Sequence, residues 1–112
     1  MPTVLPDLDV EKIRRFCRTR VPAAMADKVR IEATTRGKTV SVHERRPPWD
    51  GSPGEWTATP IAQLRYEGDG LWTLYFADRN GTWMRFPERE PLQPVDVLVS
   101  ELEEDSTCLF WG

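Results

Sequence analysis

The stretch that decides the fold spans residues 71–86 and reads LWTLYFA, then DRNG, then TWMRF. Side chains alternate in the first run, so Trp72 and Leu74 share one face of an extended segment. Asn80-Gly81 between two apolar runs is a strong hairpin signal, because both residues tolerate a positive φ. The stretch therefore predicts two antiparallel strands. The first is apolar on both faces and is expected to lie centrally in a sheet.

Three further strands are predicted upstream of this hairpin. Residues 61–66 form the first strand of a three-strand meander and are joined to it by a glycine-rich turn. Residues 29–34 and 39–43 alternate apolar and polar side chains and form a separate hairpin. The stretch between the two units, residues 45–56, holds three prolines and two glycines and is predicted to be a long loop. The expected sheet has five antiparallel strands.

An N-terminal helix is predicted before the sheet. Its apolar residues recur at helical spacing and are Val10, Ile13, Phe16, Cys17 and Val21. Asp9 is expected to cap the first turn, and Leu8 is expected to pack onto Ile13 from outside the helix. Pro22 ends the helix, because it disfavours helical angles at the preceding residue.

A C-terminal helix is predicted to begin at Pro94, since proline suits the first helical position. Its last turn is acidic, with Glu101, Glu103, Glu104 and Asp105. Acids oppose the dipole there, so they are expected to meet the arginines of the first helix or the cations of a partner. The apolar tail, residues 108–112, is expected to dock onto the core, which completes an α+β fold.

Length and composition are those of one domain over residues 1–112. The hydrophobic fraction is 39%, the charged fraction 29% and the net charge −3, which suits one packed core. No apolar run approaches the roughly 20 residues that span a bilayer, and the first residues do not resemble a signal peptide. We expect a cytoplasmic protein with reduced thiols and without a membrane partner.

No metal site, cofactor or thiol chemistry is predicted. The chain has one histidine, His43, and two distant cysteines, with no C-x-x-C pair. His43 falls on the polar face of its strand and is expected to be solvated or hydrogen-bonded. Cys17 lies on the apolar stripe of the first helix and is expected to be inert.

The loop at residues 45–56 is the main candidate for a binding site. Its candidate ligand-binding residues, with the acid that precedes them, are Glu44, Arg45, Arg46, Trp49 and Trp56. Guanidinium groups bind anions in a planar, bidentate way, and tryptophans offer stacking faces. A non-catalytic binding or regulatory module is the favoured function, with a protein or a small anionic ligand as partner. The alternative is a loop that only caps the sheet, with its arginines paired to local acids.

Glu44 suggests a second function. By strand alternation Glu44 follows the apolar residues of its strand, Arg46 comes next on that face, and Glu32 points to the other face. The pair either holds the loop through an ion bridge or forms the centre of an enzyme of unknown class. A nuclease is disfavoured, because no lysine stands two residues after Glu44. Whether the chain has catalytic activity stays open at this point.

A nucleic-acid-associated protein is the remaining alternative. The first helix carries Arg14, Arg15 and Arg18, which would contact phosphates. Trp83 and Arg85 alternate on the last strand, a pattern typical of surfaces that hold single strands. This alternative is not favoured, because residues 57–112 hold four basic and ten acidic residues, which repel phosphates.

A set of short motifs also resembles a known family. In order they are Glu44-Arg45-Arg46-Pro47-Pro48-Trp49, Trp56, Pro60-Ile61-Ala62-Gln63-Leu64-Arg65-Tyr66, Trp72-Thr73-Leu74-Tyr75, Asp78-Arg79-Asn80 and Phe110-Trp111-Gly112. Together they resemble a family of short bacterial proteins described as domain of unknown function thirty twenty-four. The resemblance covers almost the whole chain. It implies a stand-alone bacterial domain and brings no activity, cofactor or catalytic residue with it.

Overall fold

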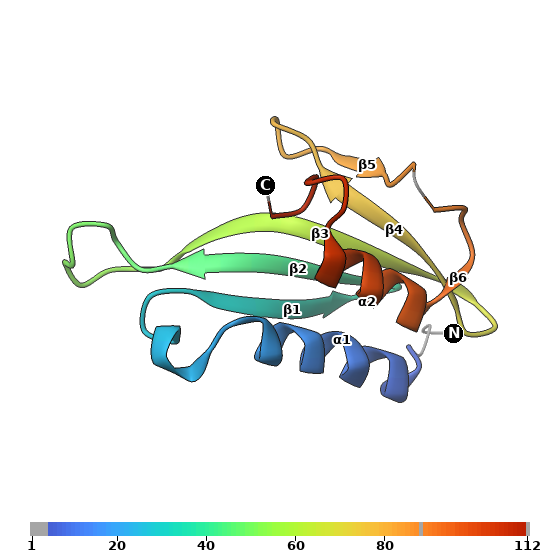
Figure 1. Ribbon diagram of the computed structural model, residues 1–112, viewed down its shortest axis with the longest axis horizontal. Helices are drawn as coiled ribbons and strands as arrows, with labels where there is room; N and C mark the ends of the chain where they lie inside the picture. Colours follow the sequence, from blue (N-terminus) through green and yellow to red (C-terminus); the bar gives the residue numbers. More distant parts are fainter. Residues whose placement is uncertain (1–4, 88, 112) are drawn as a thin grey trace.

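The α+β fold predicted from the sequence is confirmed. The computed structural model describes residues 5–87 and 89–111 (Figure 1), so residues 1–4, 88 and 112 lie outside this description. In chain order the elements are α1 (Asp7–Arg20), the 3₁₀ turn η1 (Ala23–Met25), β1 (Arg30–Arg36), β2 (Thr39–Arg46), β3 (Thr57–Gly68), β4 (Leu71–Ala77), β5 (Trp83–Arg85), β6 (Gln93–Pro94) and α2 (Val95–Glu104).

The sheet is antiparallel, with the strand order β1-β2-β3-β4-β5. The central position predicted for β4 is confirmed, although β4 has only short partners on one side. β5 pairs with its C-terminal half and β6 with its N-terminal half. The two-residue β6 was not predicted. It consists of Gln93 and Pro94, and a segment of that length carries no periodicity from which a strand can be recognised.

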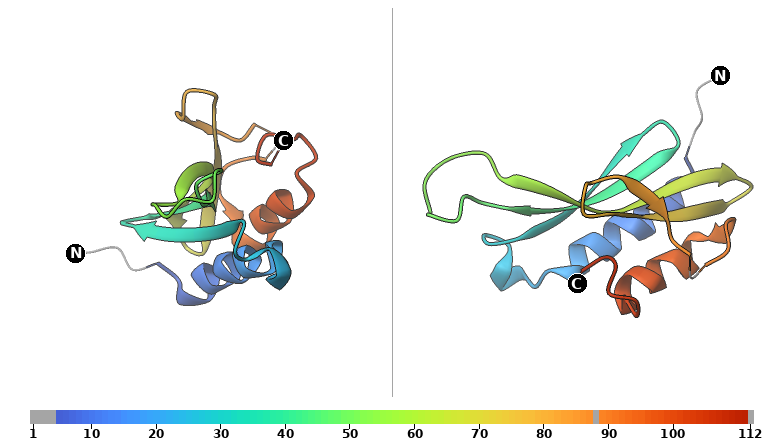
Figure 2. Two further views of the ribbon diagram at one scale, coloured as in Figure 1. Left: turned by 90° about the vertical axis from the view of Figure 1, so that its left-hand side faces the viewer. Right: turned by 90° about the horizontal axis from the view of Figure 1, so that it is seen from above.

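Both helices pack on the same face of the sheet, as the end-on view in Figure 2 shows. Alternation along the strands turns one set of side chains towards them. The fully buried members of this set are Val40, Val42, Ala62, Leu64 and Trp72. In the part of the chain that the structure describes, no helix covers the opposite face. One side of the sheet thus carries the core and the other side is open.

The start of α1 differs from the prediction. The helix begins at Asp7 after Pro6, and no side chain caps it. Asp9 instead accepts a hydrogen bond on Oδ2 from Trp72 Nε1, at 2.9 Å. Leu8 is 78% exposed, so its predicted packing onto Ile13 is wrong. The sequence pattern could not reveal the competing donor, because Trp72 is 63 residues away.

The helices lie side by side, as expected, but their charges do not meet in the predicted way. Lys12 Nζ of α1 lies 3.1 Å from Asp96 Oδ2 of α2. In the last turn of α2, Glu101 is buried and pairs with Arg89 of the preceding loop. Arg18 pairs with Glu11 of its own helix. The acidic turn is thus offset by a local cation and not by the arginines of α1.

The predicted docking of the tail is confirmed for Phe110 and Trp111, whereas Cys108 and Leu109 are exposed. The Phe110 ring is buried 5.3 Å from that of Phe86, and the Trp111 ring lies 6.2 Å from that of Phe16. Asp105 ends α2 in a left-handed conformation, and its carboxylate accepts the backbone N–H groups of Phe110 and Trp111. Gly112, the last residue of the predicted tail, lies outside the described residues.

Within residues 5–87 and 89–111, neither α1 nor α2 is long and apolar enough to cross a bilayer.

Candidate functional site

The predicted loop is shorter than expected, because β2 continues to Arg46. Arg45 pairs with Ala58 and Arg46 with Thr57, so the β2–β3 ladder extends over residues assigned to the loop. Arg45 and Arg46 are therefore strand residues, and alternation turns them to opposite faces. The irregular segment is residues 47–56. The sequence suggested an earlier end because the charged residues before Pro47 show no apolar alternation.

The five predicted site residues do not converge on one point. On the helix-bearing face, Arg46 Nε donates to Glu44 Oε1 at 2.8 Å. On the open face, Arg45 Nη1 donates to Glu32 Oε2 at 3.2 Å. The faces predicted for Glu44, Arg46 and Glu32 are confirmed, and each arginine pairs with a nearby acid, as in the capping alternative. A single pocket that uses both Arg45 and Arg46 is ruled out by this division.

The two loop tryptophans behave differently. Trp56 is half-buried at the base of the loop, and the guanidinium carbon of Arg30 lies 4.3 Å above its ring. Trp49 is 97% exposed and belongs to the segment of residues 47–56, which extends past the end of the sheet in Figure 1. The capping interpretation therefore fits Trp56, while Trp49 is free to contact a ligand.

A small hollow of about 250 Å³ lies beside Glu44 on the helix-bearing face. Its walls include Arg20, Arg46 and Trp111, and its remaining lining is apolar apart from Glu44. The described residues that line it include no serine, threonine, cysteine, lysine or histidine. The hollow thus places one carboxylate between guanidinium groups and offers no nucleophile beside it.

The open face of the sheet carries a concentration of basic and aromatic side chains. From alternation and register, its strand residues are Arg30, Glu32, Thr34 and Arg36 of β1, Thr39, Ser41, His43 and Arg45 of β2, Ala58, Pro60, Gln63, Arg65 and Glu67 of β3, Leu71, Thr73, Tyr75 and Ala77 of β4, and Trp83 and Arg85 of β5. Five arginines and two glutamates give these residues a formal charge of +3 in a chain of net charge −3. The molecule is therefore strongly asymmetric in charge.

Side chains on this face hold one another in place. Arg65 stacks on the Tyr75 ring with 3.7 Å from its guanidinium carbon to the ring centroid. Its Nε donates to Gln63 Oε1 at 2.7 Å, and Gln63 Nε2 donates to Ser41 Oγ at 3.1 Å. This chain of contacts crosses β2, β3 and β4. It orders a guanidinium and an aromatic ring at the surface before any ligand arrives, which lowers the entropic cost of binding.

A hollow of about 220 Å³ lies on the open face, lined by Glu32, Thr34, His43, Arg45 and Ala58. Partial burial lowers the pKa of His43 below its ordinary value, and the positive charge of Arg45 lowers it further, against the opposing effect of Glu32. Arg45 Nε is buried and has no hydrogen-bond acceptor among the described residues. The hollow thus combines an unsatisfied donor with an imidazole that an anion would help to protonate.

The open face was only partly visible in the sequence. Trp83 and Arg85 were recognised as a basic-aromatic pair, but the acidic composition of residues 57–112 argued against them. That argument fails because the acids of this half lie mainly in turns and in α2, whereas β1 and β2 bring arginines from the other half. Counting charges by strand face, and not by half of the chain, would have indicated this candidate surface from the sequence.

Within the described ranges, no three histidine, cysteine, aspartate or glutamate residues are grouped to hold a metal ion. Burial raises the pKa of the Cys17 thiol to about 11, against the opposing charge of Arg18. Cys17 is thus a protonated core residue at neutral pH, whereas Cys108 is exposed.

Comparison with known proteins identifies a family. A family model described as "Domain of unknown function (DUF3024)" matches residues 1–112. No curated protein and no solved structure matches the chain. The family match agrees with the resemblance carried by the short motifs, whereas the bacterial origin stays a prediction.

Proposed function

This chain belongs to the DUF3024 family, and from its own surface we propose that it is a non-catalytic module that binds single-stranded nucleic acid on the open face of the sheet. The observation that carries the proposal is the gathering of five arginines and three aromatic residues on one uncovered face. A single domain over residues 1–112 and a cytoplasmic location belong to the same proposal.

Electrostatics favours an anionic polymer over a single small anion. The arginines are spread from β1 to β5, with Arg30 and Arg36 on one edge strand and Arg85 on the other. Strands in a sheet are about 4.8 Å apart, so these charges span a distance over which several phosphates of one chain fit. Because each phosphate contact releases condensed counterions, affinity is expected to fall steeply with salt.

Aromatic groups distinguish a single strand from a duplex. Tyr75 and Trp83 lie on neighbouring strands of the open face, and Trp56 lies near its other end under Arg30. Unpaired bases stack on such rings, at about 1–3 kcal/mol per base, whereas the bases of a duplex are hidden from them. The exposed Trp49 offers a further ring to a strand that leaves the sheet along the loop.

The proposed nucleic-acid surface is the open face of the sheet. The sequence had suggested α1 instead. In α1, Arg18 is held by Glu11 at 2.6 Å, and the Arg20 guanidinium stacks on Trp111 at 4.3 Å. The helix has no stacking platform comparable to the open face. The proposal also extends the predicted loop site, since Arg45 and Trp56 belong to the open face while Glu44 and Arg46 do not.

A binding assay with matched charge variants tests the proposal. The probe is a fluorescein-labelled 12-nucleotide single-stranded RNA of mixed sequence, with its DNA counterpart and the corresponding duplexes. Fluorescence anisotropy at 50–200 mM salt is expected to show single strands bound more tightly than duplexes. The double variant Arg65→Glu/Arg85→Glu is expected to lose at least about tenfold in affinity and to have a shallower salt slope.

The control variant is Lys12→Glu/Arg15→Glu, which changes the net charge equally but lies on α1. It is expected to bind within about twofold of the wild type, after correction for the long-range field. Equal losses in both variants would show only a general charge effect and would contradict a site on the open face. Absence of binding to every probe at 50 mM salt would reject the function itself.

His43 gives a separate pH prediction. Its pKa is lowered in the free protein, and a phosphate placed in the adjacent hollow would raise it, so binding takes up a proton. Affinity is therefore expected to increase by about threefold as the pH falls from 7.5 to 5.5. His43→Gln is expected to remove this increase, and anisotropy titrations at fixed ionic strength measure it.

A further inference from the structure

Trp49 is the most exposed large apolar side chain among the residues that the structure describes, at 97%. Burying a tryptophan removes about 150–250 Å² from water, so an indole ring left in solvent forgoes a large gain in free energy. Tryptophan is also enriched among the few residues that carry most of the binding energy at protein interfaces. Trp49 therefore has the properties of an anchor for a binding partner.

The projecting loop presents Trp49 on an ordered turn. The backbone N–H of Gly51 donates to the Pro48 carbonyl at 3.1 Å, which closes a turn around Trp49. Ser52 donates to Asp50 Oδ1 from its backbone N–H at 3.0 Å and from its hydroxyl at 2.7 Å. The ring of Pro48 also fixes φ immediately before Trp49. This order lowers the entropic cost of inserting the indole ring into a partner.

The hollow beside Glu44 has the apolar walls that an indole ring needs. It lies at the end of the molecule from which residues 47–56 project, next to η1 (Figures 1 and 2). Its volume is about 250 Å³, and an apolar cavity of roughly 150 Å³ already holds a benzene ring. One wall, Met25, is itself 40% exposed. The apolar lining residues are Val21, Pro22, Met25, Val29, Ile31 and Trp111.

The charge of the loop complements that of the hollow. Residues 47–56 include two acids, Asp50 and Glu55, and no basic residue. In the hollow, Arg46 is paired with Glu44. Arg20 stacks on the Trp111 ring and makes no ion pair with any residue that the structure describes. The hollow thus has one surplus positive charge to set against the acidic loop.

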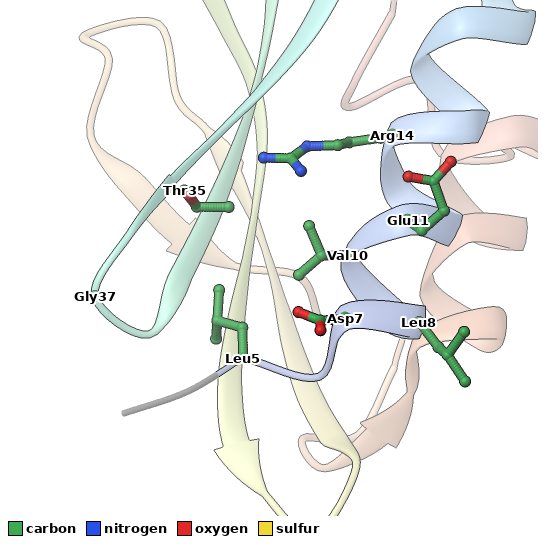
Figure 3. A pocket seen from close by; sticks show the side chains of 8 residues that line it. All are labelled: Leu5, Asp7, Leu8, Val10, Glu11, Arg14, Thr35 and Gly37. Atoms are coloured by element: carbon green, nitrogen blue, oxygen red, sulfur yellow. The ribbon is translucent and has the colours of Figure 1, made fainter. Parts of the chain in front are cut away.

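The largest hollow of the molecule fits the loop less well. It has a volume of about 630 Å³ and lies at the start of α1, at the opposite end from the loop. Figure 3 shows its charged lining residues, which are Asp7, Glu11 and Arg14. Two acids and one arginine leave a surplus of negative charge, which would repel Asp50 and Glu55.

We propose that two copies of this chain associate about a two-fold axis, with Trp49 of each copy inserted into the hollow beside Glu44 of the other. Arg46 lines the hollow and precedes Trp49 by only three residues. Anchor and acceptor are therefore neighbours on each copy, and one axis can generate two identical contacts. Inside the hollow the ring would cover Met25, whose flexible side chain adapts to aromatic groups, and would meet the Arg20 guanidinium.

The size of the contacts predicts a weak and reversible dimer. Two tryptophans and the surfaces that cover them bury roughly 600–1,000 Å², less than the roughly 1,200–2,000 Å² of a stable protein interface. The hollow lies on the helix-bearing face, so the dimer does not depend on the proposed binding of nucleic acid to the open face. Trp49 can serve only one of the two at a time, and a strand that reaches the loop would compete with the second copy.

Sedimentation velocity of the full chain, without nucleic acid, tests for the dimer. Between about 5 and 500 µM the wild type is expected to shift from monomer to dimer. Trp49→Ala is expected to weaken association by at least about tenfold, whereas Trp49→Phe, which keeps an aromatic ring, loses about threefold. The matched control is Leu8→Ala, since Leu8 is 78% exposed at the other end of the molecule. It is expected to change association by less than about twofold.

A mixing experiment locates the acceptor. Met25→Glu places an acid in the hollow and is expected to weaken association by at least about tenfold. The Trp49→Ala chain retains an intact hollow, and the Met25→Glu chain retains Trp49. Adding the unlabelled Met25→Glu chain to the ¹⁵N-labelled Trp49→Ala chain is therefore expected to shift the amide resonances of Val21 and Val29. The unlabelled double variant Trp49→Ala/Met25→Glu supplies no anchor and is expected to leave them unchanged.

Four results would overturn the proposal. A wild type that stays monomeric at every concentration would reject the dimer. Equal effects of Trp49→Ala and Leu8→Ala would exclude Trp49 as its anchor. Unchanged amide resonances in the mixing experiment would exclude the hollow as the acceptor. Weaker binding of single-stranded RNA by Trp49→Ala, with sedimentation equal to that of the wild type, would assign the ring to nucleic acid instead.

Discussion

Replacing Trp72 by alanine is expected to lower the free energy of unfolding by about 3–5 kcal/mol, the range found when a large buried aromatic side chain is truncated. Trp72 is fully buried on the helix-bearing side of β4, and its ring lies 5.0 Å from that of Tyr66. Its indole N–H also binds Asp9 of α1. The residue therefore joins the sheet to the first helix by packing and by a hydrogen bond. Chemical denaturation followed by far-ultraviolet circular dichroism measures the loss.

The hydrogen bond can be separated from the packing. Trp72→Phe keeps most of the apolar contact but removes the donor, and a hydrogen bond to a charged group contributes about 1.5–3 kcal/mol. Asp9→Ala removes the acceptor. The two substitutions remove the same bond, so a double-mutant cycle measures their coupling. The variant Trp72→Phe/Asp9→Ala is expected to lose less free energy of unfolding than the sum of the losses of the two single variants.

Trp49 provides the matched control, since it is 97% exposed on the projecting loop. Trp49→Ala is expected to change the unfolding free energy by no more than about 0.5 kcal/mol. A loss of similar size in the Trp49 and Trp72 variants would contradict the assignment of one tryptophan to the core and the other to the surface.

Replacing Phe110 by alanine is expected to lower the free energy of unfolding by about 3–4 kcal/mol. Phe110 is buried against Phe86, and its backbone N–H is held by Asp105. Loss of this anchor also loosens the next residue, Trp111, whose indole N–H donates to the Leu102 carbonyl at 2.8 Å. The tail is thus expected to contribute as much stability as an internal core element.

Leu109→Ala is the control for the tail, because Leu109 is exposed next to Phe110. This substitution is expected to lower the free energy of unfolding by less than about 1 kcal/mol. Denaturation midpoints and slopes of both variants give the comparison. A loss below 1 kcal/mol in Phe110→Ala would mean that the tail unfolds before the rest of the chain and is not part of its cooperative core.

The candidate site was harder to predict than the fold, for a reason that Arg45 and Arg46 illustrate. Their pairing with nearby acids matches the capping alternative, and the face of Glu44 was predicted correctly. Their place in β2 was not, because strand ends depend on pairing with β3, which begins 11 residues after Arg46. The open face itself is assembled from five strands, so no single stretch of sequence displays its charge.

The sequence by itself determined the local elements: two amphipathic helices, the hairpins, the helix stop at Pro22 and the apolar tail. Each follows from periodicity or turn chemistry within a few residues, where φ and ψ preferences and alternation act directly. Only the tertiary structure decided that both helices cover one face, that Trp72 binds Asp9 and that β1 is left as an edge. These features depend on contacts between residues far apart in the chain. A local pattern shows that one face of an element is buried, but not which other element packs against it.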